Sequence, residues 1–123
     1  MLAGDNVAGV DEDVETRLRA ALRDALNTRD VVAAFAVRSA LGAIGNAGAV
    51  PADAAAGAIE TAPAVGTTEA ARRQLSPAEL QAIVEAEISE RQATAGQYEQ
   101  TGHGDRAETL RREARVLQAV LDG

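Results

Sequence analysis

The abundance of alanine is the feature that most constrains how this chain can fold. Alanine accounts for 29 of the 123 residues, about half of the 46% that are apolar. It has the highest intrinsic helix propensity but buries little surface. The large aliphatic residues and phenylalanine together number only 26. These counts predict an all-α protein of one domain with a thin hydrophobic core.

The rarer residue types exclude several classes of function. The chain contains no cysteine, one histidine and two aromatic residues, Phe35 and Tyr98. The absence of cysteine excludes disulfide scaffolds, thiolate metal sites and cysteine nucleophiles. The single histidine, His103, excludes sites with several histidine ligands, and we expect neither a metal nor a cofactor. The shortage of aromatic side chains argues against single-strand binding by base stacking.

The distribution of charge and hydropathy bears on location and partners. No apolar run approaches the roughly 18 residues of a membrane span, and residues 1–13 lack a signal-peptide pattern. We therefore expect a cytoplasmic protein that does not enter a membrane. The net charge of −7 disfavours a nucleic-acid partner. However, residues 11–47 carry five arginines against six acids, and residues 72–115 carry seven against eight. The acidity therefore lies mainly in the tails and the central loop.

Apolar residues repeat at helical spacing in four segments. The first begins near Asp11 and ends near residues 27–28, and the second runs from residues 28–30 to about residue 47. The third begins at residue 77 after Ser76, which forms a capping-box pattern with Glu79, and ends at residues 101–104.

The fourth segment runs to about residue 121, and Asp105 with Glu108 is a second possible capping box. Residues 1–10 have no helical period and predict a disordered tail. Residues 48–74 contain two prolines and three glycines, which is typical of a flexible insertion, although 52–59 could form one or two helical turns. Short connections elsewhere predict two antiparallel helical hairpins joined by this long loop, in a single domain over 11–123.

The predicted core consists of large aliphatic residues on the four apolar stripes. They are Leu18, Leu22, Leu26, Val37, Leu41, Ile44, Leu80, Val84, Ile88, Leu110, Leu117 and Leu121. Phe35 lies beside the second stripe and is expected to widen it. Gly42 and Gly45 weaken that helix by roughly 1 kcal/mol each relative to alanine, and they could allow another helix to approach closely.

No motif in the sequence points to catalysis. The chain lacks a P-loop, a dinucleotide-binding glycine pattern and a nucleophile elbow. His103 lies between two glycines, and we interpret it as a turn residue. Glu87 and Arg91 have the spacing of an acid-then-base salt bridge on one helix, which we prefer to a catalytic or metal-binding role for Glu87.

All twelve basic residues are arginines, and their clusters are candidates for phosphate contacts. The alternative is a solvated helix face with weak ion pairs. Two arginines, Arg38 and Arg91, are expected on buried helix faces, with Asp30, Glu87 or Glu113 as partners. The candidates for nucleic-acid binding are Arg19, Arg23, Arg106, Arg111, Arg112 and Arg115.

Two segments of the sequence resemble the YqeY-like proteins, also described as the GatB/YqeY domain family. Residues 25–47 contain an Arg-Asp pair, a Val-Arg pair and an Ala-Ile-Gly-Asn-Ala close, and residues 75–121 are similar to the family's next hairpin. The resemblance covers residues 17–47 and 75–121. The motif residues that carry it are Arg29, Asp30, Arg38, Asn46, Glu87, Arg91, Tyr98 and Gly102.

This resemblance implies an all-helical fold related to the C-terminal tail of the B subunit of tRNA-dependent amidotransferase. That enzyme is a carbon–nitrogen ligase with glutamine as nitrogen donor, and its tail contacts tRNA while catalysis takes place in other domains. The family's second, smaller helical domain is expected to be absent here, and residues 48–74 exceed its usual link.

We therefore expect a non-catalytic module that binds tRNA or a translation-related protein, such as a component of an amidotransferase or a synthetase. The alternative is a protein-interaction or dimerisation module with no nucleic-acid role, in which the chain forms a weak homodimer. By family association alone, the resemblance also implies carbon–nitrogen ligase activity with glutamine as amido-nitrogen donor.

Overall fold

Four α-helices make up the part of the chain that the structure describes. The structure is a computed structural model and describes residues 13–49 and 74–123. The helices are α2 (Val14–Asn27), α3 (Val31–Ala47), α6 (Pro77–Gln100) and α7 (Gly104–Asp122). These residues contain no strand, so the all-α prediction is confirmed. The predicted tail over 1–10, the helical turns over 52–59 and most of the predicted insertion lie outside the described residues.

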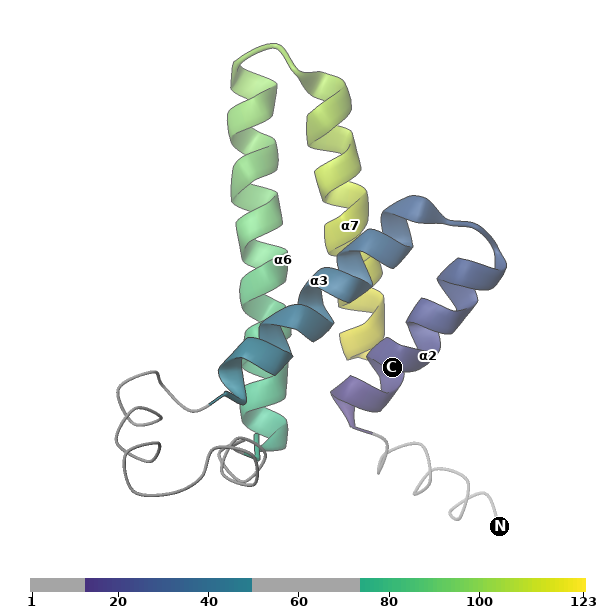
Figure 1. The fold of residues 1–123 in the computed structure, drawn as a ribbon. Helices are drawn as coiled ribbons and strands as arrows, with labels where there is room; N and C mark the ends of the chain where they lie inside the picture. Colours follow the sequence, from purple (N-terminus) through teal and green to yellow (C-terminus); the bar gives the residue numbers. More distant parts are fainter. Residues whose placement is uncertain (1–12, 50–73) are drawn as a thin grey trace, which may run out of the picture.

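The helices pair as two hairpins, as predicted (Figure 1). Helices α6 and α7 form a long antiparallel hairpin, and α2 and α3 form a shorter one. Helix α3 crosses obliquely over the longer hairpin and contacts each of the other three helices. It joins the short hairpin to the long one, and within the described residues every pair of helices is in contact.

The helix starts follow the local sequence at three of the four positions. Asp13 accepts a hydrogen bond from the Thr16 backbone N–H at 2.7 Å, and this bond lowers the pKa of the Asp13 carboxyl. Asp30 caps α3 in the same way. Ser76 and Glu79 form the predicted capping box, with reciprocal bonds of 3.1 and 2.8 Å. Each cap satisfies a backbone donor that has no partner within its helix.

The second capping box, predicted for Asp105 and Glu108, is wrong. Helix α7 begins at Gly104, with His103 at the cap position and no side-chain cap. The turn ends at His103, so Gly104 is the first helical residue and Asp105 the second. The Asp105 carboxylate instead lies in the first turn, where the helix dipole favours negative charge.

In both hairpins, the first helix ends with the same hydrogen-bonding pattern, the Schellman motif. After α2, the Asp30 N–H donates to the Ala25 carbonyl and the Arg29 N–H donates to the Leu26 carbonyl. The equivalent bonds after α6 place Gly102 at φ +84°, a conformation that favours glycine at this position of the motif. Arg29 adopts φ +57° at the matching position, and it is the only non-glycine residue with positive φ in the described residues.

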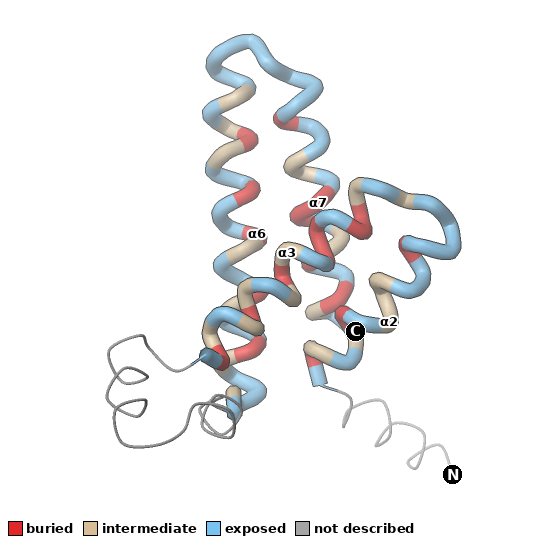
Figure 2. Tube along the Cα trace, viewed as in Figure 1, coloured by how far each residue is buried: buried red, intermediate tan, exposed pale blue. Residues whose placement is uncertain are grey.

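The core forms where the two hairpins cross (Figure 2). Its largest fully buried side chains are Leu18, Val37, Val84 and Leu117, one from each helix. Of the predicted core, seven residues are buried and four are half-buried. The prediction for Leu26 is wrong, since its side chain is 49% exposed. Ala25 takes the inward position, and the next residue lies about 100° further round the helix.

Alanine contributes more to the core than its small surface suggests. Ala36, Ala40, Ala95 and Ala107 are fully buried. Small side chains shorten the distance between helix axes, so close approach replaces bulk. The two glycines of α3 do not serve this purpose, because nothing among the described residues lies within 4 Å of a Cβ placed at Gly42 or Gly45.

Three substitutions to or from glycine test the backbone conformations in α6 and in the two turns. Gly96→Ala in the interior of α6 meets no atom within 4 Å, so we expect unfolding free energy to rise by about 0.5–1 kcal/mol. Gly102→Ala places a Cβ at positive φ and should lose about 1–2 kcal/mol. Arg29→Gly relieves the same strain and should stabilise the protein. Urea denaturation measures all three, and a Gly102→Ala variant as stable as the wild type would contradict the turn geometry.

Candidate interaction surface

A buried ionic network joins three of the four helices. Arg91, which is 8% exposed, donates from Nε to Glu113 Oε1 and from Nη1 to Glu87 Oε1, both at 2.8 Å. Ser39 of α3 donates its hydroxyl to the same Glu87 oxygen at 3.0 Å. The predicted Glu87–Arg91 pair and the predicted burial of Arg91 are therefore confirmed. Glu113, which the sequence offered as one possible partner, supplies the second carboxylate.

The network uses these carboxylates for structure. Burial disfavours the charged guanidinium, but the hydrogen bonds to Glu87 and Glu113 outweigh it and raise the pKa of Arg91. Arg91 also donates to the Glu87 backbone carbonyl at 3.2 Å. No buried side-chain nitrogen or oxygen in the described residues lacks a hydrogen-bond partner. The network therefore leaves no unpaired buried group with which to bind or activate a substrate.

Removal of the arginine should unfold a large part of the protein population. Arg91→Ala leaves Glu87 and Glu113 as uncompensated carboxylates, a change that typically costs about 3–5 kcal/mol. Replacing all three with apolar residues of similar volume should be markedly less destabilising than Arg91→Ala alone, because no charge is then stranded. Thermal unfolding followed by circular dichroism measures both variants. Equal stability of Arg91→Ala and the wild type would show that the network contributes nothing.

Most of the arginines predicted to bind nucleic acid are already paired with acids. Arg111 pairs with Glu99 at 2.7 Å and Arg115 pairs with Glu108 at 3.1 Å. Arg112 pairs with Asp30 at 2.7 Å, and Arg19 pairs with Glu15. The hydrogen bond from Arg111 also lowers the pKa of Glu99. These ion pairs reduce the positive potential of the predicted clusters, since each arginine faces a carboxylate.

The end of the long hairpin holds a small aromatic cluster. The Arg106 guanidinium lies 5.5 Å from the Tyr98 ring centre, and His103 packs edge-on against the same ring at 5.9 Å. A cation above an aromatic face is favourable. His103 also hydrogen-bonds Thr101 within the turn, at 3.0 Å between Nδ1 and Oγ1. The interpretation of His103 as a turn residue is confirmed, and Arg106 has a structural partner in Tyr98.

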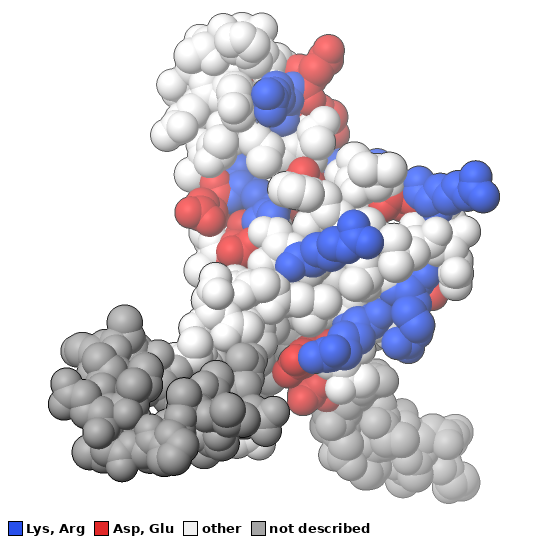
Figure 3. Space-filling model, viewed as in Figure 1, with Lys and Arg blue, Asp and Glu red and all other residues white. Residues whose placement is uncertain are grey.

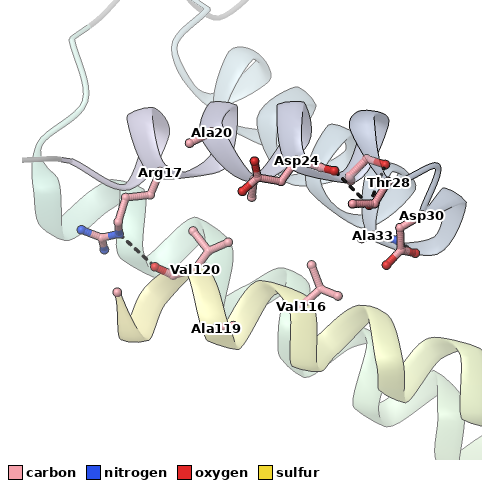
Figure 4. Close-up of a pocket in the computed structure, with 12 residues that line it drawn as sticks. Arg17, Ala20, Asp24, Thr28, Asp30, Ala33, Val116, Ala119 and Val120 are labelled. Atoms are coloured by element: carbon pink, nitrogen blue, oxygen red, sulfur yellow. Dashed lines mark hydrogen bonds between the residues drawn. The ribbon is translucent and has the colours of Figure 1, made fainter.

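Two polar contacts fasten the short hairpin to α7. Arg17 donates from Nε to the Val120 carbonyl at 2.9 Å, and Arg112 binds the Asp30 carboxylate that caps α3. Between them lies a groove of about 470 Å³ bordered by α2 and α7, and five of its twelve lining residues are alanines, including Ala20 and Ala119 (Figure 4). The groove follows from the small side chains, which leave space between the two helices.

Three arginines of the short hairpin remain without partners. Within the described residues, no acid pairs with Arg23, Arg29 or Arg38, and all three are exposed. The prediction that Arg38 lies on a buried face is wrong, because it is on the side of α3 opposite the core. Asn46 also lies exposed near the end of α3. Figure 3 shows basic side chains spread over the α2–α3 hairpin on the face in view.

Large apolar side chains lie beside these arginines. Val31 is 77% exposed and Phe35 is 60% exposed, and both project from α3 near the partly exposed Leu26 of α2. Together with Arg29 and Arg38 they border a crease of about 380 Å³. We refer to Leu26, Arg29, Val31, Phe35 and Arg38 as the α2–α3 surface.

Sequence reasoning assigned Phe35 to the buried face, and this prediction is wrong. The signal that could have corrected it is helical phase. Phe35 lies about 100° round the helix from Ala34, which belongs to the buried stripe. Val31, Phe35 and Arg38 are spaced at i, i+4 and i+7, so they form a separate stripe on the outward face.

Comparisons with known proteins identify no relative from which a function could be inferred. No family model, no curated protein and no solved structure matches the chain. Among residues 13–49 and 74–123, no three acidic or histidine side chains are grouped as they would be around a metal ion. None of the helices in the described ranges is long and apolar enough to cross a membrane.

Proposed function

We propose that this chain is a non-catalytic interaction module that binds a protein partner through the α2–α3 surface. The observation that carries the proposal is the composition of α3. Its 17 residues include one charged side chain, Arg38, although Val31, Phe35 and Arg38 on its outward face are exposed. A helix that is apolar on nearly all sides is normally buried on all sides. A partner that covers Val31 and Phe35 accounts for this composition.

The residue types on the surface also suit a protein partner. Aromatic residues and arginine are enriched at the centres of protein interfaces, where apolar area is buried and polar groups surround it. Phe35 with Arg29 and Arg38 matches that composition. The resemblance to YqeY-like proteins suggests that the partner is a component of the translation machinery.

Binding of tRNA is a second candidate function, favoured by the three arginines of the short hairpin that have no acidic partner within the described residues. An arginine that is free to neutralise a phosphate displaces a cation condensed on the nucleic acid, and Arg23, Arg29 and Arg38 meet this condition. The aliphatic side chains at the centre of the surface favour a protein, because a phosphate backbone would leave Val31 exposed to water.

The α2–α3 surface should be required for association but not for folding. Val31→Glu with Phe35→Glu replaces exposed side chains, so we expect stability to change by no more than about 0.5 kcal/mol. Affinity purification with quantitative mass spectrometry should show partner proteins that are retained by the wild type and lost by this variant. The matched control is Ala86→Glu on the exposed face of α6. Equal recovery of all partners by the three proteins would contradict the proposal.

A titration with total tRNA separates the two candidate functions. For a protein-binding module, we expect no retention of tRNA on filters at about 10 µM protein in low salt, a range that non-specific binders reach. Tight, salt-dependent binding that is lost when Arg23, Arg29 and Arg38 are changed to glutamate would instead assign the surface to tRNA. Arg115→Glu serves as the control, because Arg115 is already paired on its own helix.

A further inference from the structure

Resting on the proposed function, we infer that the partner presents an amphipathic α-helix with acidic residues beside its apolar stripe. Three features of the α2–α3 surface point to this occupant: the shape of the crease, the form of the outward face of α3 and the charge around both.

The crease is suited to a few aliphatic side chains. Its volume of about 380 Å³ is near the lower end of the range of about 300–1,000 Å³ typical of ligand pockets. Its lining includes two buried alanines, Ala25 and Ala34, with the larger side chains of Leu26, Val31 and Phe35 around them. Small residues between large ones form a recess that a leucine or isoleucine from a partner can fill.

The outward face of α3 extends from this crease along the helix axis. After Val31, Phe35 and Arg38, the same face continues to Gly42 and Gly45, where an added Cβ would meet no described residue within 4 Å. From residue 31 to residue 45 the helix rises about 21 Å at 1.5 Å per residue. A partner helix of about four turns lying along α3 would contact apolar side chains at one end and backbone at the other.

The positive charge around the crease favours acidic residues beside the apolar side chains of the partner helix. Arg29 and Arg38 line the crease, and Arg23 lies one helical turn before Leu26. The one acid in the lining, Asp30, is occupied by Arg112 and by the Ala33 backbone N–H. A two-fold dimer through this surface would place arginine opposite arginine, so charge complementarity favours an acidic partner over a second copy.

Other modes of peptide recognition fit this surface poorly. Addition of a strand needs an exposed sheet edge, and the described residues contain no strand. Proline-rich segments bind grooves lined by several aromatic rings, and Phe35 is the one aromatic residue in the lining of this crease. A helix in a groove, with anchors at i, i+3 or i+4, and i+7, suits the apolar crease and the stripe of α3 that continues from it.

Peptide display tests this inference. The whole chain is immobilised, and two displayed libraries are selected for binding to it. One library is a rigid helical scaffold with randomised surface positions, and the other consists of unconstrained linear peptides. Sequences that also bind the Phe35→Glu variant are removed by counter-selection. This variant should fold normally, because position 35 is exposed on α3. We expect enrichment of helical sequences with leucine or isoleucine on one stripe and glutamate or aspartate beside it. Their affinity should fall at least about tenfold for Phe35→Glu, and as much for Arg29→Glu with Arg38→Glu.

Charge reversal and self-association complete the test. Selected helices in which each glutamate is replaced by lysine should bind the Arg29→Glu, Arg38→Glu variant more tightly than they bind the wild type. Enrichment of linear or basic sequences that depend on Phe35 would overturn this inference and leave the proposed function in place. No enrichment that depends on Phe35 would overturn both. Dimerisation seen by sedimentation and abolished by Phe35→Glu would assign the surface to a second copy and overturn the acidic helix.

Discussion

The pairing of Arg91 with Glu87 and Glu113 is the interaction on which the rest of this structure depends. It places one cation between two carboxylates in a core that contains few large side chains. Through Ser39 it also links α3 to the long hairpin. A core in which eight of the seventeen buried apolar residues are alanine has limited apolar area to specify one arrangement of helices. The network adds one directional contact between α3 and the long hairpin.

The position of α3 determines what the molecule exposes. The buried side of this helix packs on all three neighbours, and its outward side carries Val31, Phe35 and Arg38 into solvent. The turn before it holds Arg29 at positive φ, where the corresponding turn of the long hairpin has glycine. Strained backbone is often retained where it supports binding. The location of Arg29 beside the exposed apolar residues agrees with a binding role for this turn.

Much of the fold could be predicted from the sequence, because its signals are local. Helical periodicity, the Ser76–Glu79 box and Gly102 identified the helices and the turn between α6 and α7. The buried Glu87–Arg91 pair also follows from spacing alone. Leu26 and Phe35 were misplaced because both lie close to an apolar stripe, and alanine took the inward position in each case. Hydrophobicity favours burial for either residue, while helix packing decides between them.

The candidate site was harder to predict, because pairing depends on tertiary contacts. Arg112 and Asp30 are distant in sequence, yet their ion pair removes one of the predicted phosphate contacts. Arg111 is likewise neutralised by Glu99 across the long hairpin. Within the described residues, the arginines with neither an acidic nor an aromatic partner therefore lie on the α2–α3 hairpin, whereas Arg106 of α7 packs on Tyr98. No count of charges along the chain distinguishes an arginine with a partner from one without.

Site-specific photo-crosslinking in cells tests the central claim most directly. A photoreactive phenylalanine analogue at position 35 should give a discrete protein adduct that disappears when Arg29 and Arg38 are changed to glutamate. The same analogue at the exposed position 92 of α6 should give none. Absence of an adduct at position 35, or adducts with RNA in place of protein, would contradict the assignment of this surface to a protein partner.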